Sequence, residues 1–166
     1  MKKLIASILA IALCLSMTSA LADVMGMGMV TAIDASSATS EKDGTIQIST
    51  TACAVTLDAD GKIASIQFDV MQSPKVAVSA TGEFADTSAA DLRTKMEKGE
   101  DYAMRSASPI GKELFEQVEV LEAYCLGKTA EEAVAGFEND ADAKAGCTIH
   151  VDDFFAALTK AAANAK

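Results

Sequence analysis

A short stretch near the C-terminus, Asp142 to His150, carries residue types that could hold a phosphate group. Gly146 lacks a Cβ atom, so its backbone can adopt a positive φ or approach a ligand closely. Thr148 offers a hydroxyl group just before a helix that we expect to begin near Asp152. Because the first N–H groups of a helix are unpaired and favour an anion, this stretch predicts a small-residue turn where a phosphate could bind or be attached.

The spacing Asp142-x-x-Ala-Gly-Cys-Thr148 resembles the D-x-x-(S/T)-G-A-(T/S) signature of FMN-binding domains, such as that of the C subunit of the sodium-pumping NADH:quinone reductase. In that family a dedicated FAD:protein FMN transferase esterifies the last residue of the signature to the phosphate of FMN. The resemblance implies that Thr148 is the attachment site. It also implies that Asp142, Gly146 and Cys147 belong to the cofactor-binding motif.

The order of segments is also similar to that of a group of secreted proteins of anaerobic Gram-positive bacteria. The resemblance implies a secreted electron-transfer protein that holds FMN, covalently or noncovalently, and carries the flavin rather than acting on a substrate of its own. Its implied partners are the FMN transferase and a redox partner in the membrane or outside the cell. The alternative is a non-redox secreted or cell-surface binding protein that keeps the fold and has lost the cofactor.

The residues of the motif also allow a purely structural interpretation. The Thr148 hydroxyl could bond a nearby backbone group, with Gly146 serving only the turn. Asp152 and Asp153 already place negative charge at the expected helix N-terminus and would compete with a phosphate. His150, the single histidine of the chain, could contact a flavin or simply be half-buried. Both interpretations stay open at this point.

A second candidate region is the loop from Glu100 to Ala107, which has polar flanks and no periodicity. It carries two large apolar side chains, Tyr102 and Met104, which could form the flat apolar surface that an isoalloxazine ring needs. They could equally cap the open end of the core. A two-part flavin site requires this loop and the Thr148 turn to line one common cleft.

The elements that would position these residues begin with strands. We expect a strand over residues 28–34, with Met25, Met27 and Met29 as core filler rather than a soft-metal cluster. The segment 45–57 alternates with a parity switch that predicts a β-bulge, and the turn at 58–61 returns the chain into 62–71 as a hairpin. A short strand over 75–79 completes an antiparallel β-meander.

Helices follow the strands. Ser88 predicts the N-cap of a short helix that Gly99 ends, and Ser108 predicts the N-cap of a helix over 109–126 with Glu113 outside its apolar stripe. Thr129 begins a capping box for a helix that ends at Gly136, and a last helix covers 152–163. Strands followed by helices predict an α+β fold, an antiparallel β-meander packed against several helices in a single domain.

Composition bounds the remaining possibilities. Residues 1–22 have the basic start, apolar run and Ala20-Leu-Ala22 site of a signal peptide, which leaves 23–166 as the FMN-binding-like domain and predicts a secreted protein. Without Lys2 and Lys3 this domain carries 12 basic against 24 acidic side chains, a net charge of −12 that argues against nucleic-acid binding. Its three cysteines lack zinc-site spacing and its acidic loops lack the EF-hand pattern, so we expect no zinc or calcium and buried free thiols.

Overall fold

The structure is a computed structural model that describes residues 23–166, so the predicted signal peptide lies outside the described residues. Four strands come first and the helices follow, which confirms the α+β prediction. The elements are β1 (Val24–Ser36), β2 (Gly44–Leu57), β3 (Ile63–Gln72), β4 (Val76–Val78), α2 (Lys95–Lys98), the 3-10 helix η1 (Gly99–Tyr102), α3 (Leu114–Cys125), α4 (Ala130–Gly136), the 3-10 helix η2 (Phe137–Asn139), α5 (Ala141–Gly146) and α6 (Asp152–Ala163).

The sheet is antiparallel in the order β1-β2-β3, and β4 pairs with β2 beyond the end of β3. The predicted hairpin turn is confirmed, because the Asp58 carboxylate accepts hydrogen bonds from the N–H groups of Asp60 and Lys62, both at 2.9 Å. The bulge inside β2 was wrong: β1 and β2 pair one to one along their full length, and the only shift, between β2 and β3, lies at Thr56 and Leu57. The apolar residues change from even to odd positions because Ile48 points to the exposed face of the strand, whereas Cys53, Val55 and Leu57 point to the buried face.

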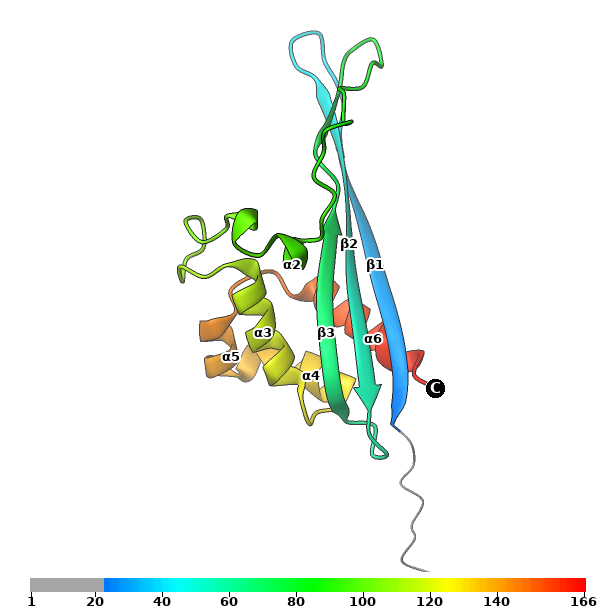
Figure 1. Ribbon diagram of the computed structural model, residues 1–166, viewed down its shortest axis with the longest axis vertical. Helices are drawn as coiled ribbons and strands as arrows, with labels where there is room; N and C mark the ends of the chain where they lie inside the picture. The colour runs from blue at the N-terminus through cyan, green and yellow to red at the C-terminus, as the bar shows by residue number, and fades with distance from the viewer. Residues whose placement is uncertain (1–22) are drawn as a thin grey trace, which may run out of the picture.

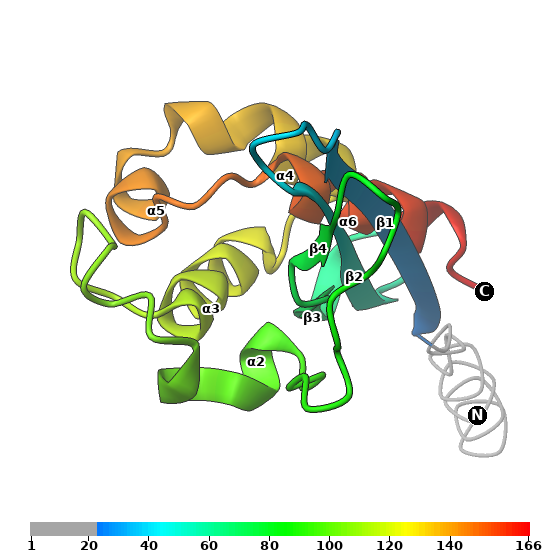
Figure 2. The same cartoon turned by 90° about the horizontal axis from the view of Figure 1, so that it is seen from above.

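Helix α6 lies against one face of the sheet, mainly over β1 and β2, while α2 to α5 gather beside β3 (Figures 1 and 2). Gly26 and Gly28 allow the close approach, since a Cβ atom on Gly28 would lie 2.2 Å from the carbonyl oxygen of Ala157. The ring of Phe154 on α6 meets that of Phe68 on β3 edge to face at 5.3 Å. The core therefore lies between the sheet and α6 and extends to α3.

The free edge of β1 is covered by the end of the chain. Lys166 exchanges two backbone hydrogen bonds with Met25, at 3.4 and 3.1 Å. Asn164 Nδ2 donates to the carbonyl oxygen of Met27 at 3.1 Å, and Lys160 Nζ donates to that of Met29 at 2.9 Å. These bonds occupy edge groups that would otherwise be free to pair with another strand.

The methionines of β1 are not core filler, so that interpretation was wrong. Because side chains alternate across a strand, the two glycines face α6 and the methionines point to the opposite face. The exposed fractions are 70% for Met25, 58% for Met27 and 52% for Met29. The residues that bring α6 onto the sheet are the glycines between them.

The opposite edge of the sheet is closed by α3 and the loop after it. Glu122 Oε1 on α3 accepts a hydrogen bond of 2.7 Å from the N–H group of Phe68, and burial raises the pKa of this carboxyl. Ile63 pairs with the backbone of Gly127 and Lys128 through two bonds of 2.9 Å. The strand β3 therefore has partners on both sides.

Two helix starts differ from the sequence prediction. The N-cap of α2 is Thr94, which forms a capping box with Glu97, and Ser88 instead bonds the Asp86 side chain in the preceding loop. The segment after Ser108 is a turn in which Gly111 has a φ of 65°, so α3 begins only at Leu114. The capping box of Thr129 and the last helix, from Asp152 to Ala163, are confirmed.

In the described residues no helix combines the length and apolarity needed to span a bilayer.

The cysteines at 53, 125 and 147 are free and buried, as expected. Burial raises the pKa of both Cys53 and Cys125 to about 12.

These raised pKa values make the stability of the protein depend on pH. As the pH rises, the unfolded chain releases its thiol protons before the folded protein does. The contribution of the two protonated thiols to stability is therefore fully present below pH 9.0 and is lost as the pH rises toward about 12. We expect the free energy of unfolding to fall across this window in urea titrations. A Cys53→Ala, Cys125→Ala variant should show a smaller fall; an equal fall would contradict this origin.

Candidate functional site

Asp142 to Gly146 of the stretch that resembles the FMN-attachment signature belong to helix α5, and only Cys147 to His150 are irregular, so the turn predicted around Gly146 was wrong. Asp140 caps α5 by accepting a hydrogen bond of 2.9 Å from the Ala143 N–H group. Asp142 lies exposed in the first turn of this helix. Gly146 is the last helical residue and does not have a positive φ. A Cβ atom on it would lie 2.8 Å from Cγ1 of Val120, so the glycine lets α5 approach α3 closely.

Thr148 follows α5 and is bonded to a side chain of α3. Both its backbone N–H group, at 2.9 Å, and its hydroxyl, at 3.1 Å, are within hydrogen-bond distance of Gln117 Oε1. The Gln117 side chain is fully buried, whereas Thr148 is exposed. The Nε2 group of Gln117 donates to Ser108 Oγ at 3.2 Å and to the Lys112 carbonyl oxygen at 3.3 Å. One amide thus joins the motif to the loop that precedes α3.

Two neighbouring hollows surround this region. The first, here called the Tyr102 hollow, has a volume of about 300 Å³ and is lined by Ser49, Thr51, Val70, Lys95, Tyr102, Met104, Leu114, Ile149, His150, Asp153 and Phe154. The second, the Thr148 hollow, has a volume of about 330 Å³ and is lined by Phe137, Glu138, Lys144, Cys147, Thr148, Ile149, His150, Val151 and Asp152. Ile149 and His150 line both, so the two hollows are adjacent.

The structure therefore gathers some of the candidate residues and not others. Tyr102 and Met104 line one hollow, and Thr148 and Cys147 line the next. Cys147 is buried, and burial raises the pKa of its thiol, so it forms part of the wall in its neutral form. Asp142 and Gly146 line neither hollow. The single common cleft that we expected for a two-part site is therefore not formed, and the loop and the motif instead line two hollows that share Ile149 and His150.

The loop that carries Tyr102 and Met104 is held in a strained conformation. Ala103, between them, has a φ of 57° and lies in the left-handed region, which is uncommon for a residue with a side chain. The Glu113 carboxylate accepts hydrogen bonds from the N–H groups of Met104 and Arg105, both at 2.8 Å. Only 1% of Glu113 is exposed, so its predicted position outside the apolar stripe was wrong. Strain of this kind is found where a loop must present side chains in a fixed geometry.

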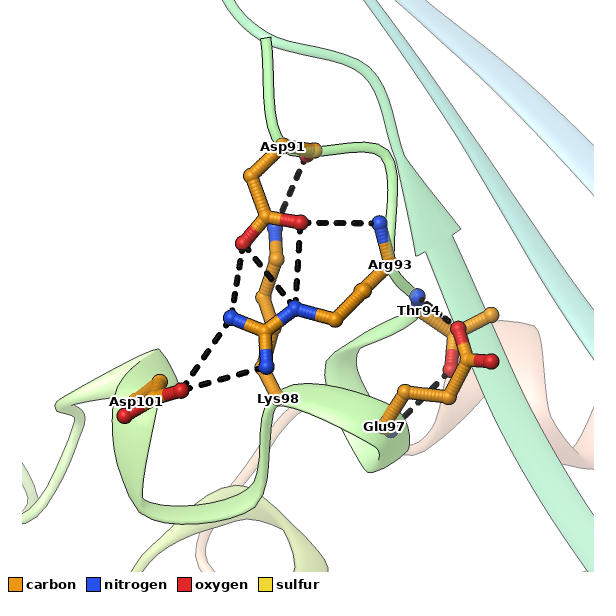
Figure 3. A network of polar contacts seen from close by, with 6 residues as sticks. All are labelled: Asp91, Arg93, Thr94, Glu97, Lys98 and Asp101. Carbon is orange, nitrogen blue, oxygen red and sulfur yellow. Dashed lines mark hydrogen bonds and ion pairs between the residues drawn. The ribbon is translucent and has the colours of Figure 1, made fainter.

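A network of charged side chains anchors the other wall of the Tyr102 hollow. Arg93 bonds the carboxylates of Asp91, at 2.9 Å, and Asp101, at 3.1 Å, and so joins the segment before α2 to η1 (Figure 3). Hydrogen bonds from Arg93 lower the pKa of Asp91 to about 2, so it stays ionised at neutral pH. Within this frame Lys95 Nζ lies 5.0 Å from the ring centre of Tyr102, a cation–π contact.

The Thr148 hollow has a mixed charge. Lys144 is paired with Glu138 at 2.6 Å, and Asp152 adds a second carboxylate at the start of α6. The exposed His150 lies at the border with the Tyr102 hollow. The first turn of α6 therefore already has acidic neighbours, and the walls do not form a strongly basic anion site.

Sequence reasoning missed Glu113, Gln117 and Lys95. Glu113 was placed outside the apolar stripe, because polar side chains on an amphipathic helix usually face solvent, and Gln117 was not considered. The sequence holds only a weak indication that these two side chains are buried: each directly precedes an apolar residue of the stripe, Leu114 after Glu113 and Val118 after Gln117. Lys95 could not have been assigned, because its role depends on where η1 folds.

Comparison with known proteins gives a limited result. No family model matches the chain and no solved structure is similar to it. A chlorophenol reductase of Desulfitobacterium hafniense is 32% identical over 103 residues, which are 56% of this chain and 32% of the relative. The chain thus spans about a third of the length of the curated relative that it matches.

Proposed function

We propose that the protein is a secreted electron-transfer protein that holds FMN across the Tyr102 hollow and the Thr148 hollow. The observation that carries the proposal is the adjacency of the two hollows, one with large apolar side chains and the other with an exposed threonine hydroxyl at the end of the signature-like stretch. Bound FMN would supply reversible electron acceptance, while the protein sets its position and environment.

The size and chemistry of the hollows fit a ring with a polar tail. Small-molecule sites have volumes of about 300–1,000 Å³, so each hollow alone is at the lower limit and the pair together is ample. The Tyr102 hollow has apolar walls from Met104, Leu114 and Phe154 for the faces of a ring. Lys95 and Thr51 offer hydrogen-bond donors for its polar edge. These features support a placement of the ring in the Tyr102 hollow and of the phosphate in the Thr148 hollow.

A covalent link at Thr148 agrees better with the local charge than a purely ionic phosphate site. Glu138 and Asp152 oppose a free phosphate, whereas an ester bond does not depend on a basic wall. The Thr148 hydroxyl donates to Gln117 Oε1 and its side chain is exposed, so the oxygen is fixed and reachable. The FAD:protein FMN transferase is the partner that would form the ester, with a membrane or extracellular redox protein as the electron partner.

The name of the relative, chlorophenol reductase, is the only feature of it that supports redox chemistry. The similarity covers a third of the relative. We do not extend its substrate to this chain. A redox role fits both this name and the resemblance to FMN-binding domains.

Replacing Thr148 with valine is expected to abolish flavin attachment while the fold is retained. Valine keeps the shape and the backbone N–H bond to Gln117 but removes the hydroxyl oxygen. The protein would be co-expressed with an FMN transferase in a secreting host and measured by intact mass and flavin absorbance. The wild type should gain the mass of one esterified FMN, and the Thr148→Val variant should not.

A Thr31→Val variant is the matched control, because Thr31 is an exposed β1 threonine that bonds Thr50 and lines neither hollow. It should load flavin like the wild type. Flavin retained covalently by Thr148→Val would show that the attachment residue is another one. A wild type with neither added mass nor flavin absorbance would refute the proposed function.

The second candidate is a non-redox binding protein with the same fold. It is favoured by the fact that the motif has structural partners of its own: Gly146 packs on Val120, and Thr148 bonds Gln117. Under this alternative the purified protein is colourless whatever the host. The mass measurement described above separates the two.

A further inference from the structure

Three methionine thioethers form a row on the outer face of β1. Met25, Met27 and Met29 alternate with the two glycines that contact α6, and β1 pairs with β2 without a shift through this region. The regular register keeps all three side chains on one face. Each is more than half exposed, so their sulfur atoms are reachable from solvent.

We propose that this row binds a soft monovalent metal ion of the Cu(I) or Ag(I) class. Thioether sulfur is a soft ligand that selects such ions over magnesium, calcium and other hard cations. No other cluster competes, since no group of three or more His, Cys, Asp or Glu side chains within residues 23–166 is placed to hold a metal. The net negative charge of the domain also favours the approach of cations.

Strand geometry assigns Met27 as the shared ligand. Neighbouring residues on one face of a strand are about 6.8 Å apart along the chain, and the outer two of three are about 13.6 Å apart. Methionine is unbranched with three rotatable bonds, so two neighbours can turn their sulfur atoms toward one ion between them. The outer pair is too widely spaced to do this alone. The row thus offers two overlapping pairs, Met25 with Met27 and Met27 with Met29.

The test is a titration with Ag⁺, used in place of air-sensitive Cu(I), followed by NMR of ¹³C-methyl methionine. The protein would be expressed from its full sequence and held in chloride-free buffer. The methyl signals of Met25, Met27 and Met29 should shift together and saturate. The signals of the partly buried Met96 and Met104, and of Met71, which lies on the same face of the sheet but two strands away on β3, should not move at the same silver concentrations.

Leucine substitutions distinguish binding through the methionine sulfur from binding through an apolar surface, because leucine has an apolar side chain of similar size but no sulfur. Met27→Leu should lose the saturable shift of the remaining two signals, whereas Met25→Leu and Met29→Leu should each retain it through the other pair. Met71→Leu is the control and should behave like the wild type.

Three results would overturn the proposal. They are saturable binding retained by Met27→Leu, equal shifts of all methionine signals, and silver uptake by the thiols of the core with the three β1 signals unchanged.

Discussion

Replacing Gly28 with valine is expected to destabilise the fold by about 3 kcal/mol or more, because overpacking a tight contact with backbone forces whole elements apart. A Cβ atom at this position would lie 2.2 Å from the Ala157 carbonyl oxygen and 2.5 Å from the Ala161 nitrogen. Neither atom can rotate away, since both belong to the α6 backbone. Helix α6 would have to leave the sheet, and urea unfolding of the purified variant would measure the loss.

Met29→Val is the matched control for this substitution. It places the same side chain one residue further along β1 but on the exposed face, where β-branched residues suit a strand. We expect its free energy of unfolding to stay within about 0.5 kcal/mol of the wild type. A similar loss in both variants would mean that β1 tolerates no valine here for reasons unrelated to α6.

Replacing Glu113 with alanine is expected to cost about 2–3 kcal/mol, because it removes a buried acceptor and leaves two partly buried N–H groups without their partner. Two N–H groups, those of Met104 and Arg105, lose their partner at once. The left-handed conformation of Ala103 would then relax, and the side chains on both sides of it would leave the Tyr102 hollow. Thermal unfolding would give the stability change.

Hydrogen exchange gives a second readout that a general loss of stability does not reproduce. In Glu113→Ala the amides of Met104 and Arg105 should exchange faster than the rest of the chain. Glu119→Ala, an exposed glutamate on the same helix, should leave both the stability and these amides unchanged. Normal protection of the two amides in Glu113→Ala would show that the carboxylate does not fix the loop.

The sequence is most informative where structure depends on neighbours along the chain. The Asp58 turn and the Thr129 capping box are local hydrogen-bonded units, and both are confirmed. The prediction at Ser108 was wrong because serine followed by proline suits a turn as well as a helix start. The capping box that begins α3 lies five residues later, at Glu113.

Long-range packing explains what could not be predicted. The alternation of glycine and methionine in β1 shows two distinct faces, but only the position of α6 reveals that glycine marks the buried one. In the candidate site, Thr148 was identified from a local pattern, whereas its partner Gln117 is 31 positions away. Burial of a polar side chain with all its partners satisfied leaves no mark in hydrophobic periodicity.

The bonds between Lys166 and Met25 join β1 to residues far along the chain, so they can form only after most of the chain has been made. Lys160 and its β1 partner Met29 are 131 positions apart, so the inner face and the edge of β1 remain open until α6 has been made. The β1–β2 hairpin can form early, since hairpins need only local contacts, but its core contacts wait for residues 152–166. Docking of α6 and the residues after it onto β1 is therefore a late step, and the strand is most open to misassociation before that step.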